Sequence, residues 1–422
     1  MVRSLIFLIT ISLIVIGISG CVRKSPAPRP ANKSRAVPAT AVDVLFIAYD
    51  YGESLAFKSA LARLKSKTVN VRILTFGAAD RAFRDVPEAT QLISLLTTQQ
   101  KLQHESLLNS LETQRTTTLP VELLEYVVSK WQPQVVVTGM ASTAQAQLTN
   151  KFALKNAYTV AFYDNFDNPV IQSFVQPWLA STLGVNEIFI PGDYLIKDFL
   201  KIKALSSSEI TVTGQPALDQ WIQSAKHFNR EQIFEKLNIA KNSRVVTFAA
   251  GYDQSSLNWA DKFIEAATER PDLVFFIALH PKMDNRSDAP LVKKVAGLKN
   301  VKIAPPSVTT EELVSVSALL ATHKSTVGIK AAYLGVPVLY VAEDNYDNVL
   351  ISHDLAKRAS SWSEIVNAIH YLLDYPDKKQ LSFKKLGIPL DSVPHFDDRL
   401  LTLLGHTTKK ANMPLLESIQ TG

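Results

Sequence analysis

Apolar runs of strand length alternate with amphipathic stretches along most of this chain of 422 residues. Runs such as Val135–Thr138 and Arg244–Ala249 are almost continuously apolar, which is typical of strands buried on both faces of a parallel sheet. Helical stretches separate them, among them Leu55–Ser66 and Trp259–Thr268. This βαβα order predicts an α/β fold with right-handed crossovers.

The length of the apolar pattern predicts two domains, because the body of about 380 residues is too large for one core. The first set of strands ends in TVTGQPALDQW, and a charged helical stretch precedes the second set. We therefore place the boundary near residues 215–240 and predict domains at 43–225 and 226–375. Helices and a tail are expected at 376–422.

The positive charge of the chain belongs to its N-terminal tail. The formal charge is +6, and residues 1–42 hold six basic residues and no acid, so the rest of the chain is neutral. Electrostatic binding of phosphates needs Lys and Arg clustered on the domain that binds. The sequence therefore predicts no nucleic-acid partner, and its 46% hydrophobic content is that of an ordinary globular protein.

The first residues have the zones of a secretory signal. Arg3 precedes the apolar run Leu5–Ile18, and small residues lead to Cys21, the one cysteine of the chain. The run Ile-Ser-Gly-Cys resembles the lipobox of bacterial lipoproteins. That resemblance implies a signal peptide at 1–20 and a membrane anchor on Cys21, which would carry acyl chains such as palmitate.

Two destinations stay open for such an anchor. Val22 is not the aspartate that retains many lipoproteins at the inner membrane, so the resemblance implies an outer-membrane protein facing the periplasm. Alternatively, Arg23 and Lys24 outnumber Arg3, and an uncleaved segment would then keep the body in the cytoplasm. Residues 21–42 hold four prolines and repelling charges, which predicts an extended linker.

A small-residue turn in the second half is the most informative motif. It follows the apolar run SALLAT and contains Ser325, Thr326 and Gly328, and a helical stretch and the apolar run VPVLYV come next. This order places free backbone N–H groups and hydroxyls at a helix N-terminus. Such a corner accepts phosphate.

The second half resembles the C-terminal half of GT-B glycosyltransferases and UDP-N-acetylglucosamine 2-epimerases. In these families a segment S-T-x-G-φ-E-A-A-x-x-G-x-P-V binds the nucleotide-sugar. The resemblance extends to ALHPKMD and VTGQPALD and covers about residues 43–375. It implies two Rossmann-type domains that face a central cleft, with neither metal nor cofactor and a nucleotide-sugar as partner if the protein is active. The matching positions are Ser325, Thr326, Gly328, Ala331, Ala332, Gly335 and Pro337.

Two departures from that pattern argue against the families' chemistry. Lys330 stands where the acidic residue accepts hydrogen bonds from the ribose, and an ammonium group has no acceptor. In addition, Ala249–Ser256 reads AAGYDQSS where the epimerases carry a His-Arg-Glu-Asn cluster. Epimerization needs acid and base groups there, so we do not expect it.

The resemblance implies three groups of site residues. Glu53, as a base, and His280 are the catalytic candidates. Gly52, Asp164 and Asn165 would face an acceptor or glycan, with Gly52 and Glu53 in a loop. The candidates for binding nucleotide or phosphate are Gly251, Ser325, Thr326, Gly328 and Lys330.

Structural roles explain several of the same residues. Glu53 would stabilise a helix N-terminus, and His280 would end a strand. Asp164 and Asn165 belong to a segment rich in Asp, Asn and Pro that favours turns. No spacing of His and carboxylates typical of a metal site is visible.

Two functions remain after these arguments. One is a lipid-anchored, non-catalytic or divergent GT-B-like protein that binds glycan or protein partners in the cell envelope. The alternative is a glycosyltransferase that uses a nucleotide-sugar in envelope polysaccharide or glycolipid synthesis. Since nucleotide-sugars are cytoplasmic, the export signal favours the first function.

Overall fold

The computed structural model describes residues 39–179, 184–206, 208–251, 253–280, 285–374 and 386–411. The expected signal peptide and the lipidated Cys21 lie outside the described residues, as does most of the linker. A helix that the pattern favours at 378–386 also lies almost wholly outside them. Within the described part, no helix is both long and apolar enough to cross a bilayer.

The first half forms a sheet of seven parallel strands in the order β3-β2-β1-β4-β5-β6-β7. Chain order changes direction between β1 and β4, and this topological switch point is where open α/β sheets bind ligands. The strands are β1 (Thr40–Ala48), β2 (Val71–Thr75), β3 (Ala89–Gln91), β4 (Trp131–Gly139), β5 (Tyr158–Phe162), β6 (Glu187–Ile190) and β7 (Glu209–Val212).

The second half forms a sheet of six parallel strands in the order β10-β9-β8-β11-β12-β13, with its switch point between β8 and β11. The prediction of α/β architecture with two Rossmann-type sheets is confirmed. The strands are β8 (Val245–Ala249), β9 (Val274–Ala278), β10 (Val301–Ile303), β11 (Ser317–Thr322), β12 (Val338–Val341) and β13 (Lys357–Ala359).

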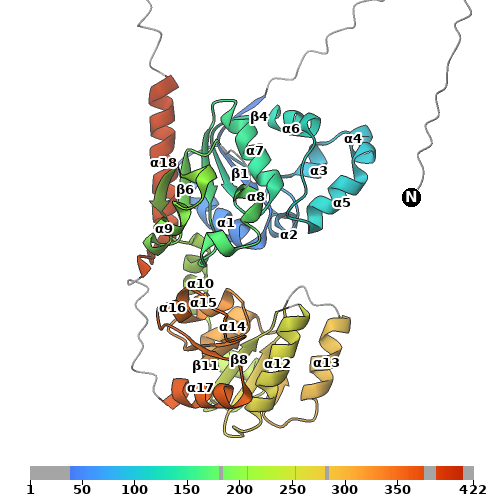
Figure 1. Ribbon diagram of the computed structural model, residues 1–422, viewed down its shortest axis with the longest axis vertical. Coiled ribbons are helices and arrows are strands. Elements are labelled where there is room, and N and C mark those ends of the chain that lie inside the picture. Colours follow the sequence, from blue (N-terminus) through green and yellow to red (C-terminus); the bar gives the residue numbers. More distant parts are fainter. Residues whose placement is uncertain are drawn as a thin grey trace, which may run out of the picture. The chain divides into compact units, whose positions relative to one another are not determined.

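Helices connect consecutive strands in both halves (Figure 1). The first half contains α1 (Tyr51–Ser66), α2 (Ala79–Ala82), α3 (Leu92–Leu95), α4 (Thr98–Gln103), α5 (Glu105–Thr113), α6 (Val121–Val128), α7 (Thr143–Ala153), α8 (Gln176–Leu179) and α9 (Ile196–Phe199). Then follow α10 (Pro216–His227), α11 (Arg230–Leu237), α12 (Gln254–Ala267), α13 (Asn285–Val295), α14 (Thr310–Val316), α15 (Val327–Tyr333), α16 (Val349–Ser352), α17 (Trp362–Asp374) and α18 (Ser392–Ala411). Three short 3-10 turns complete the described elements: Pro169–Ile171, Asp193–Leu195 and Lys203–Leu205.

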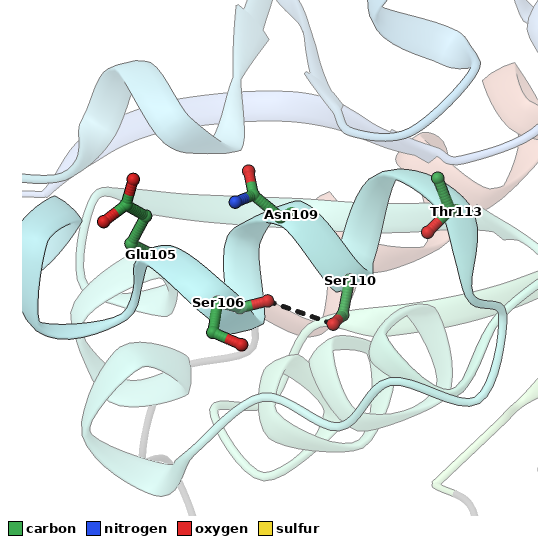
Figure 2. Close-up of a pocket in the computed structure, with 5 residues that line it drawn as sticks. All are labelled: Glu105, Ser106, Asn109, Ser110 and Thr113. Atoms are coloured by element: carbon green, nitrogen blue, oxygen red, sulfur yellow. Dashed lines mark hydrogen bonds between the residues drawn. The ribbon is translucent and has the colours of Figure 1, made fainter.

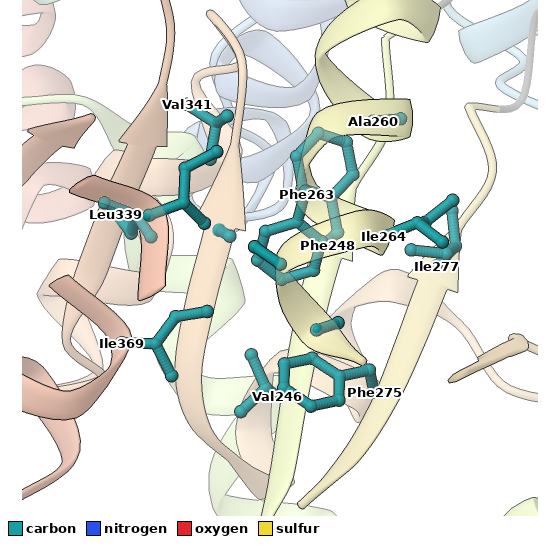
Figure 3. Packing of buried hydrophobic residues seen from close by; sticks show 14 of the residues in the cluster. Val246, Phe248, Ala260, Phe263, Ile264, Phe275, Ile277, Leu339, Val341 and Ile369 are labelled. Carbon is teal, nitrogen blue, oxygen red and sulfur yellow. The ribbon is translucent and has the colours of Figure 1, made fainter. Parts of the chain in front are cut away.

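Aliphatic and aromatic side chains together fill one face of the second sheet (Figure 3). Phe248 on β8 lies 4.9 Å from Phe263 on α12, measured between ring centroids, and Phe263 lies 5.8 Å from Phe275 on β9. All three rings are fully buried. The apolar runs of the sequence thus become strands covered by helices, as a parallel sheet requires.

The last helix, α18, packs against the first sheet and not against the second, which precedes it in the chain (Figure 1). Phe396 meets the rings of Phe162 and Phe189 edge-on, with centroids 5.3 and 5.4 Å apart. Arg399 donates two hydrogen bonds, of 2.7 and 3.0 Å, to the fully buried Glu187. A charged pair and an aromatic cluster therefore fix the C-terminal helix to β5 and β6.

We expect Phe396→Ala to lower the free energy of unfolding by about 3–5 kcal/mol, because the substitution leaves a cavity inside a closed aromatic cluster. Urea unfolding followed by circular dichroism measures the change. Leu154→Ala is the matched control, since that side chain is 71% exposed and should change stability by less than about 0.5 kcal/mol. Equal losses in the two variants would contradict the packing role of Phe396.

Candidate functional site

Three carboxyl groups meet at the switch point of the first sheet. Asp50 follows β1 and caps α1, Glu53 lies in the first turn of that helix, and Asp164 follows β5. All these strands are parallel, so their carboxyl ends share one edge of the sheet. Gly52 and Glu53 therefore belong to a helix, and the expectation that they form a loop is wrong.

Glu53 is fully buried, and its two oxygens have different surroundings. Oε1 accepts hydrogen bonds from the backbone N–H groups of Tyr49 and Asp50 and, at 2.7 Å, from the side-chain amide of Gln145. Among the described residues, Oε2 has no hydrogen-bond partner. It lies against Gly139, where a Cβ would overlap the carboxyl group, so this close approach requires glycine.

The local sequence explains why Glu53 turns inward. Asp50 accepts the N–H of the third helical residue while the carboxylate of Glu53 accepts the N–H of Asp50, which is a complete capping box. Gln145 on α7 also donates to the carbonyl of Ile47 at 3.1 Å. Glu53 and Gln145 together tie the loop after β1 to the helix after β4.

Burial raises the pKa of both inner carboxyls. It holds the pKa of Glu53 well above its ordinary range, and the nearby charge of Asp164 adds to the effect. Burial likewise raises the pKa of Asp164 to about 7; Asp50 acts in the same direction, and Arg115 opposes it. Burial thus favours the protonated form of Glu53, and Asp164, with a pKa near neutrality, has the property that acid–base chemistry requires.

A cation borders the carboxyl groups and lies over an aromatic ring. Arg115 forms an ion pair with Asp50, and its guanidinium lies 5.2 Å from the ring centroid of Phe174. Tyr51, the first residue of α1, is 54% exposed. We call the group formed by Asp50, Glu53, Asp164, Arg115 and Tyr51 the carboxyl site.

The other predicted residues of this edge have defined places. Gly52 lies so close to the carboxyl of Asp164 that a Cβ would overlap it. Asn165 accepts the N–H groups of Phe166 and Asp167 at 2.6 and 3.1 Å, which forms a turn. The structure thus brings Gly52, Glu53 and Asp164 together and gives the carbonyl oxygen of the Asn165 side chain a local role.

The switch point of the second sheet holds a chain of hydrogen-bonded side chains. Ser256 Oγ lies 2.8 Å from Asp253 Oδ2 and 3.0 Å from His323 Nδ1. His323 Nε2 lies 3.5 Å from Glu343 Oε2, and Lys324 Nζ lies 3.0 Å from the same oxygen. These polar groups therefore bind one another.

The protonation of His323 and Glu343 in this hydrogen-bonded series follows from their contacts. Burial lowers the pKa of His323, and Lys324 adds to that effect, so the imidazole favours its neutral form. Burial alone would raise the pKa of Glu343. Its own backbone N–H, Lys324 and His323 outweigh burial and bring this pKa to about 2. Asp253, Ser256 and Glu343 were not predicted as site residues. Asp253 and Glu343 each follow a strand end, which is the signal that identifies them, whereas Ser256 lies in the first turn of α12.

The residues predicted to bind phosphate differ in their surroundings: one accepts a local hydrogen bond, one is exposed and one is buried. Ser325 Oγ accepts the N–H of Val327 at 3.2 Å, and Thr326 is exposed just before α15. Gly328 is buried against the hydroxyl of Tyr340, where a Cβ would overlap it, so its small size serves packing. Gly251 has a similar place, against the hydroxyl of Ser256.

Lys330 packs against helix α10. Its ammonium lies 4.7 Å from the ring centroid of Trp221, and burial lowers its pKa although Glu311 opposes the shift. A cation–π contact thus accounts for this side chain. His280 lies just after β9 and directly before residues 281–284, which are outside the described part of the chain. Within the described part of the chain, no three His, Cys, Asp or Glu side chains converge as metal ligands would.

No family model matches the sequence, and no curated protein is similar to it in sequence. Solved structures do share its fold. The UDP-GlcNAc 2-epimerase of Neisseria meningitidis, solved bound to UDP-GlcNAc, is 16% identical, with a TM-score of 0.61 over 87% of this chain and 100% of that one. A putative UDP-N-acetylglucosamine 2-epimerase of Listeria monocytogenes is 14% identical, with a TM-score of 0.63 over 88% of this chain and 98% of that one.

A third neighbour is the wall teichoic acid polymerase TagF, solved after a soak with CDPG. It is 13% identical, with a TM-score of 0.54 over 87% of this chain and 89% of that one. At these identities the likeness concerns the fold. The chain has the GT-B architecture, and the two epimerases and the polymerase have the same fold.

We expect Asp164→Asn to weaken the pH dependence of stability. The folded Asp164 carboxyl loses its proton near pH 7 and the unfolded one near its ordinary value of 3.8. Between these values the folded state holds more protons, so this group makes stability fall as pH rises. Asparagine stays uncharged, and the loss of stability between pH 5 and pH 8 should shrink by about 2 kcal/mol.

Urea unfolding at both pH values measures this difference. Asp85→Asn, at an exposed position, is the control and should leave the pH dependence unchanged. A wild-type pH profile in Asp164→Asn would show that this carboxyl is already ionised in the folded protein at pH 5.

Proposed function

We propose that this chain is a lipid-anchored GT-B protein of the bacterial cell envelope that binds a glycan at the carboxyl site and transfers no sugar from a nucleotide donor. The observation that carries the proposal is the set of polar groups gathered at the switch point of the first sheet. The carboxyl site combines the partly exposed carboxylate of Asp50, the guanidinium of Arg115 and the exposed side chain of Tyr51. In the second sheet the corresponding polar side chains are bonded to each other.

The chemistry of the carboxyl site suits sugar hydroxyls. A hydroxyl group donates one hydrogen bond and accepts others, so it pairs with carboxylate oxygens and with guanidinium N–H groups alike. Asp50, Asp164 and Arg115 supply both kinds of partner within one edge of the sheet. The exposed ring of Tyr51 adds an apolar surface of the kind that packs against the C–H face of a sugar.

The second sheet offers less to a nucleotide. Ser256 and His323 use their polar atoms on each other and on acidic neighbours, and Lys324 is paired with Glu343. Lys330, in the place of the ribose-binding acid, lies against Trp221. A cation in contact with an aromatic ring thus stands where the ribose would need a hydrogen-bond acceptor.

The neighbours in fold support a role in envelope sugar chemistry. Two of them are named for UDP-N-acetylglucosamine, and a third is a wall teichoic acid polymerase. We extend the proposal to the membrane: Cys21 would carry lipid and hold the body at the outer membrane, facing the periplasm. The inner membrane with a cytoplasmic body is the competing location.

A glycosyltransferase is the second candidate function. The observation that favours it is the presence of two neighbouring carboxyls, Glu53 and Asp164, because a carboxyl with a pKa of about 7 is suited to remove a proton from an acceptor hydroxyl. This function also requires a bound donor. Nucleotide binding therefore separates the two candidates.

Calorimetry with UDP and with the disaccharide of N-acetylglucosamine tests the choice. We expect no heat of binding with millimolar UDP, and binding of the disaccharide that Asp164→Ala weakens about tenfold, as the loss of a hydrogen bond to a charged group predicts. Asp85→Ala is the control. Binding of UDP would contradict the proposal in favour of the transferase, and a disaccharide that does not bind would refute the glycan site.

Metabolic labelling with a radioactive fatty acid tests the anchor. We expect the wild-type protein to take up label and to fractionate with the outer membrane, whereas Cys21→Ser takes up none because it lacks the thiol. Globomycin, which blocks lipoprotein signal peptidase, should leave a larger precursor. Equal labelling of the Cys21→Ser variant would exclude this cysteine as the lipid carrier.

A further inference from the structure

A carboxyl group lies buried without a hydrogen bond on the face of α18 that packs against the first sheet. Asp397 lies beside Phe396 and about one turn before Leu400, and all three residues are fully buried. Neither carboxyl oxygen of Asp397 has a hydrogen-bond partner among the described residues. A buried polar group without partners destabilises a fold, so an apolar residue would serve the packing of α18 better.

Helix α5 shows the ordinary arrangement of polar side chains. The hydroxyl of Ser110 donates to the carbonyl of Ser106 at 3.0 Å, and Asn109 and Thr113 are exposed beside a hollow of about 460 Å³ (Figure 2). Asp397 has neither a backbone partner nor contact with solvent. Its place in α18 therefore needs another explanation.

The cation beside Asp397 is bound elsewhere. Arg63 on α1 donates to the carbonyl of Pro394 at 3.1 Å and to the exposed carboxylate of Asp398 at 2.6 Å. Its Nη1 lies 3.8 Å from Asp397 Oδ2, which is too far for a hydrogen bond. Two carboxyl groups therefore compete for one guanidinium, and an ionised Asp397 would be stabilised only weakly.

The other described elements around α18 do not compensate such a charge. β4 has no titratable side chain, and Asp219 on α10 accepts the N–H of Val393 at 2.7 Å. On β6, Glu187 is paired with Arg399. Asp219 and Glu187 are themselves acidic residues, so an ionised Asp397 would gain nothing from them.

These surroundings favour the protonated carboxyl while α18 is docked. Burial raises the pKa of Asp397 to about 7; Arg63 opposes the shift, and Asp398 adds to it. In a detached helix the carboxyl would lose its proton near the ordinary value of 3.8. Between these values the docked state holds more protons, so docking weakens as the pH rises from about 4 to 7.

We propose that α18 is a proton-controlled strap, which stays docked on the first sheet while Asp397 is protonated and detaches more readily once this carboxyl is ionised. Detachment uncovers Phe162 and Phe189, whose rings contact Phe396 in the docked state. The strap does not depend on glycan binding, because none of these residues belongs to the carboxyl site.

Hydrogen–deuterium exchange of the full-length protein in detergent, followed by mass spectrometry at pH 5.5 and pH 8, tests the strap. After correction for the intrinsic exchange rate, we expect the protection of residues 392–405 in the wild type to fall at least about tenfold between these pH values. The protection of β8, which lies in the second sheet, should fall less, because α18 detaches without unfolding of the whole chain.

Two substitutions remove the titration at this position. Asp397→Asn keeps the shape of the side chain and Asp397→Leu replaces it by an apolar one, so residues 392–405 should be equally protected at both pH values. Asp391→Asn is the matched control, since that side chain is 71% exposed just before α18, and it should retain the wild-type fall.

Equal protection of the wild-type helix at both pH values would overturn the proposal, as would a tenfold fall that persists in both Asp397 variants. Loss of protection in Asp397→Leu at pH 5.5 would show that the contact with Arg63 holds the helix, which also contradicts the proposal. An equal fall in α18 and β8 would mean that α18 opens only with the whole molecule and is no strap.

Discussion

The buried carboxyl of Glu53 is the interaction on which the first half of the molecule depends. One oxygen gathers two backbone N–H groups after β1 and the amide of Gln145 on α7, so a single side chain joins the two strands that flank the switch point. The other oxygen lies against Gly139. Since burial favours the protonated form, the group can stay in this place without a counter-ion.

The same burial shifts the neighbouring carboxyl group. Asp164 lies at the same helix N-terminus and shares the burial, which brings its pKa to about 7, while Asp50 forms an ion pair with Arg115. The second sheet uses its switch point differently. There Asp253, Ser256 and His323 are linked by hydrogen bonds in a linear series. The position expected to be acidic is Lys330, whose ammonium lies over the ring of Trp221.

The sequence predicted the parallel sheets well because burial on both faces leaves a local trace, the nearly continuous apolar run seen in β4 and β8. The start of α1 could also be predicted from the sequence. Asp50 followed three residues later by Glu53 is the pattern of a capping box, which predicts a helix start and not a loop.

Other features depend on residues far apart in the chain. Nothing near Phe396 or Arg399 indicates that α18 returns to β5 and β6, because Glu187 lies about two hundred residues earlier. Likewise, the contact between Lys330 and Trp221 arises only once α10 packs beside α15. Such contacts are set by the topology of the whole chain, and no local pattern encodes them.

The central claim is that the glycan occupies the first half of the molecule. A crystal structure of the protein soaked with the hexasaccharide of N-acetylglucosamine tests it most directly. The account predicts sugar rings that contact Asp164 and Arg115 at the edge of the first sheet. Rings that lie instead beside His323 and Lys324, with the edge of the first sheet empty, would contradict it.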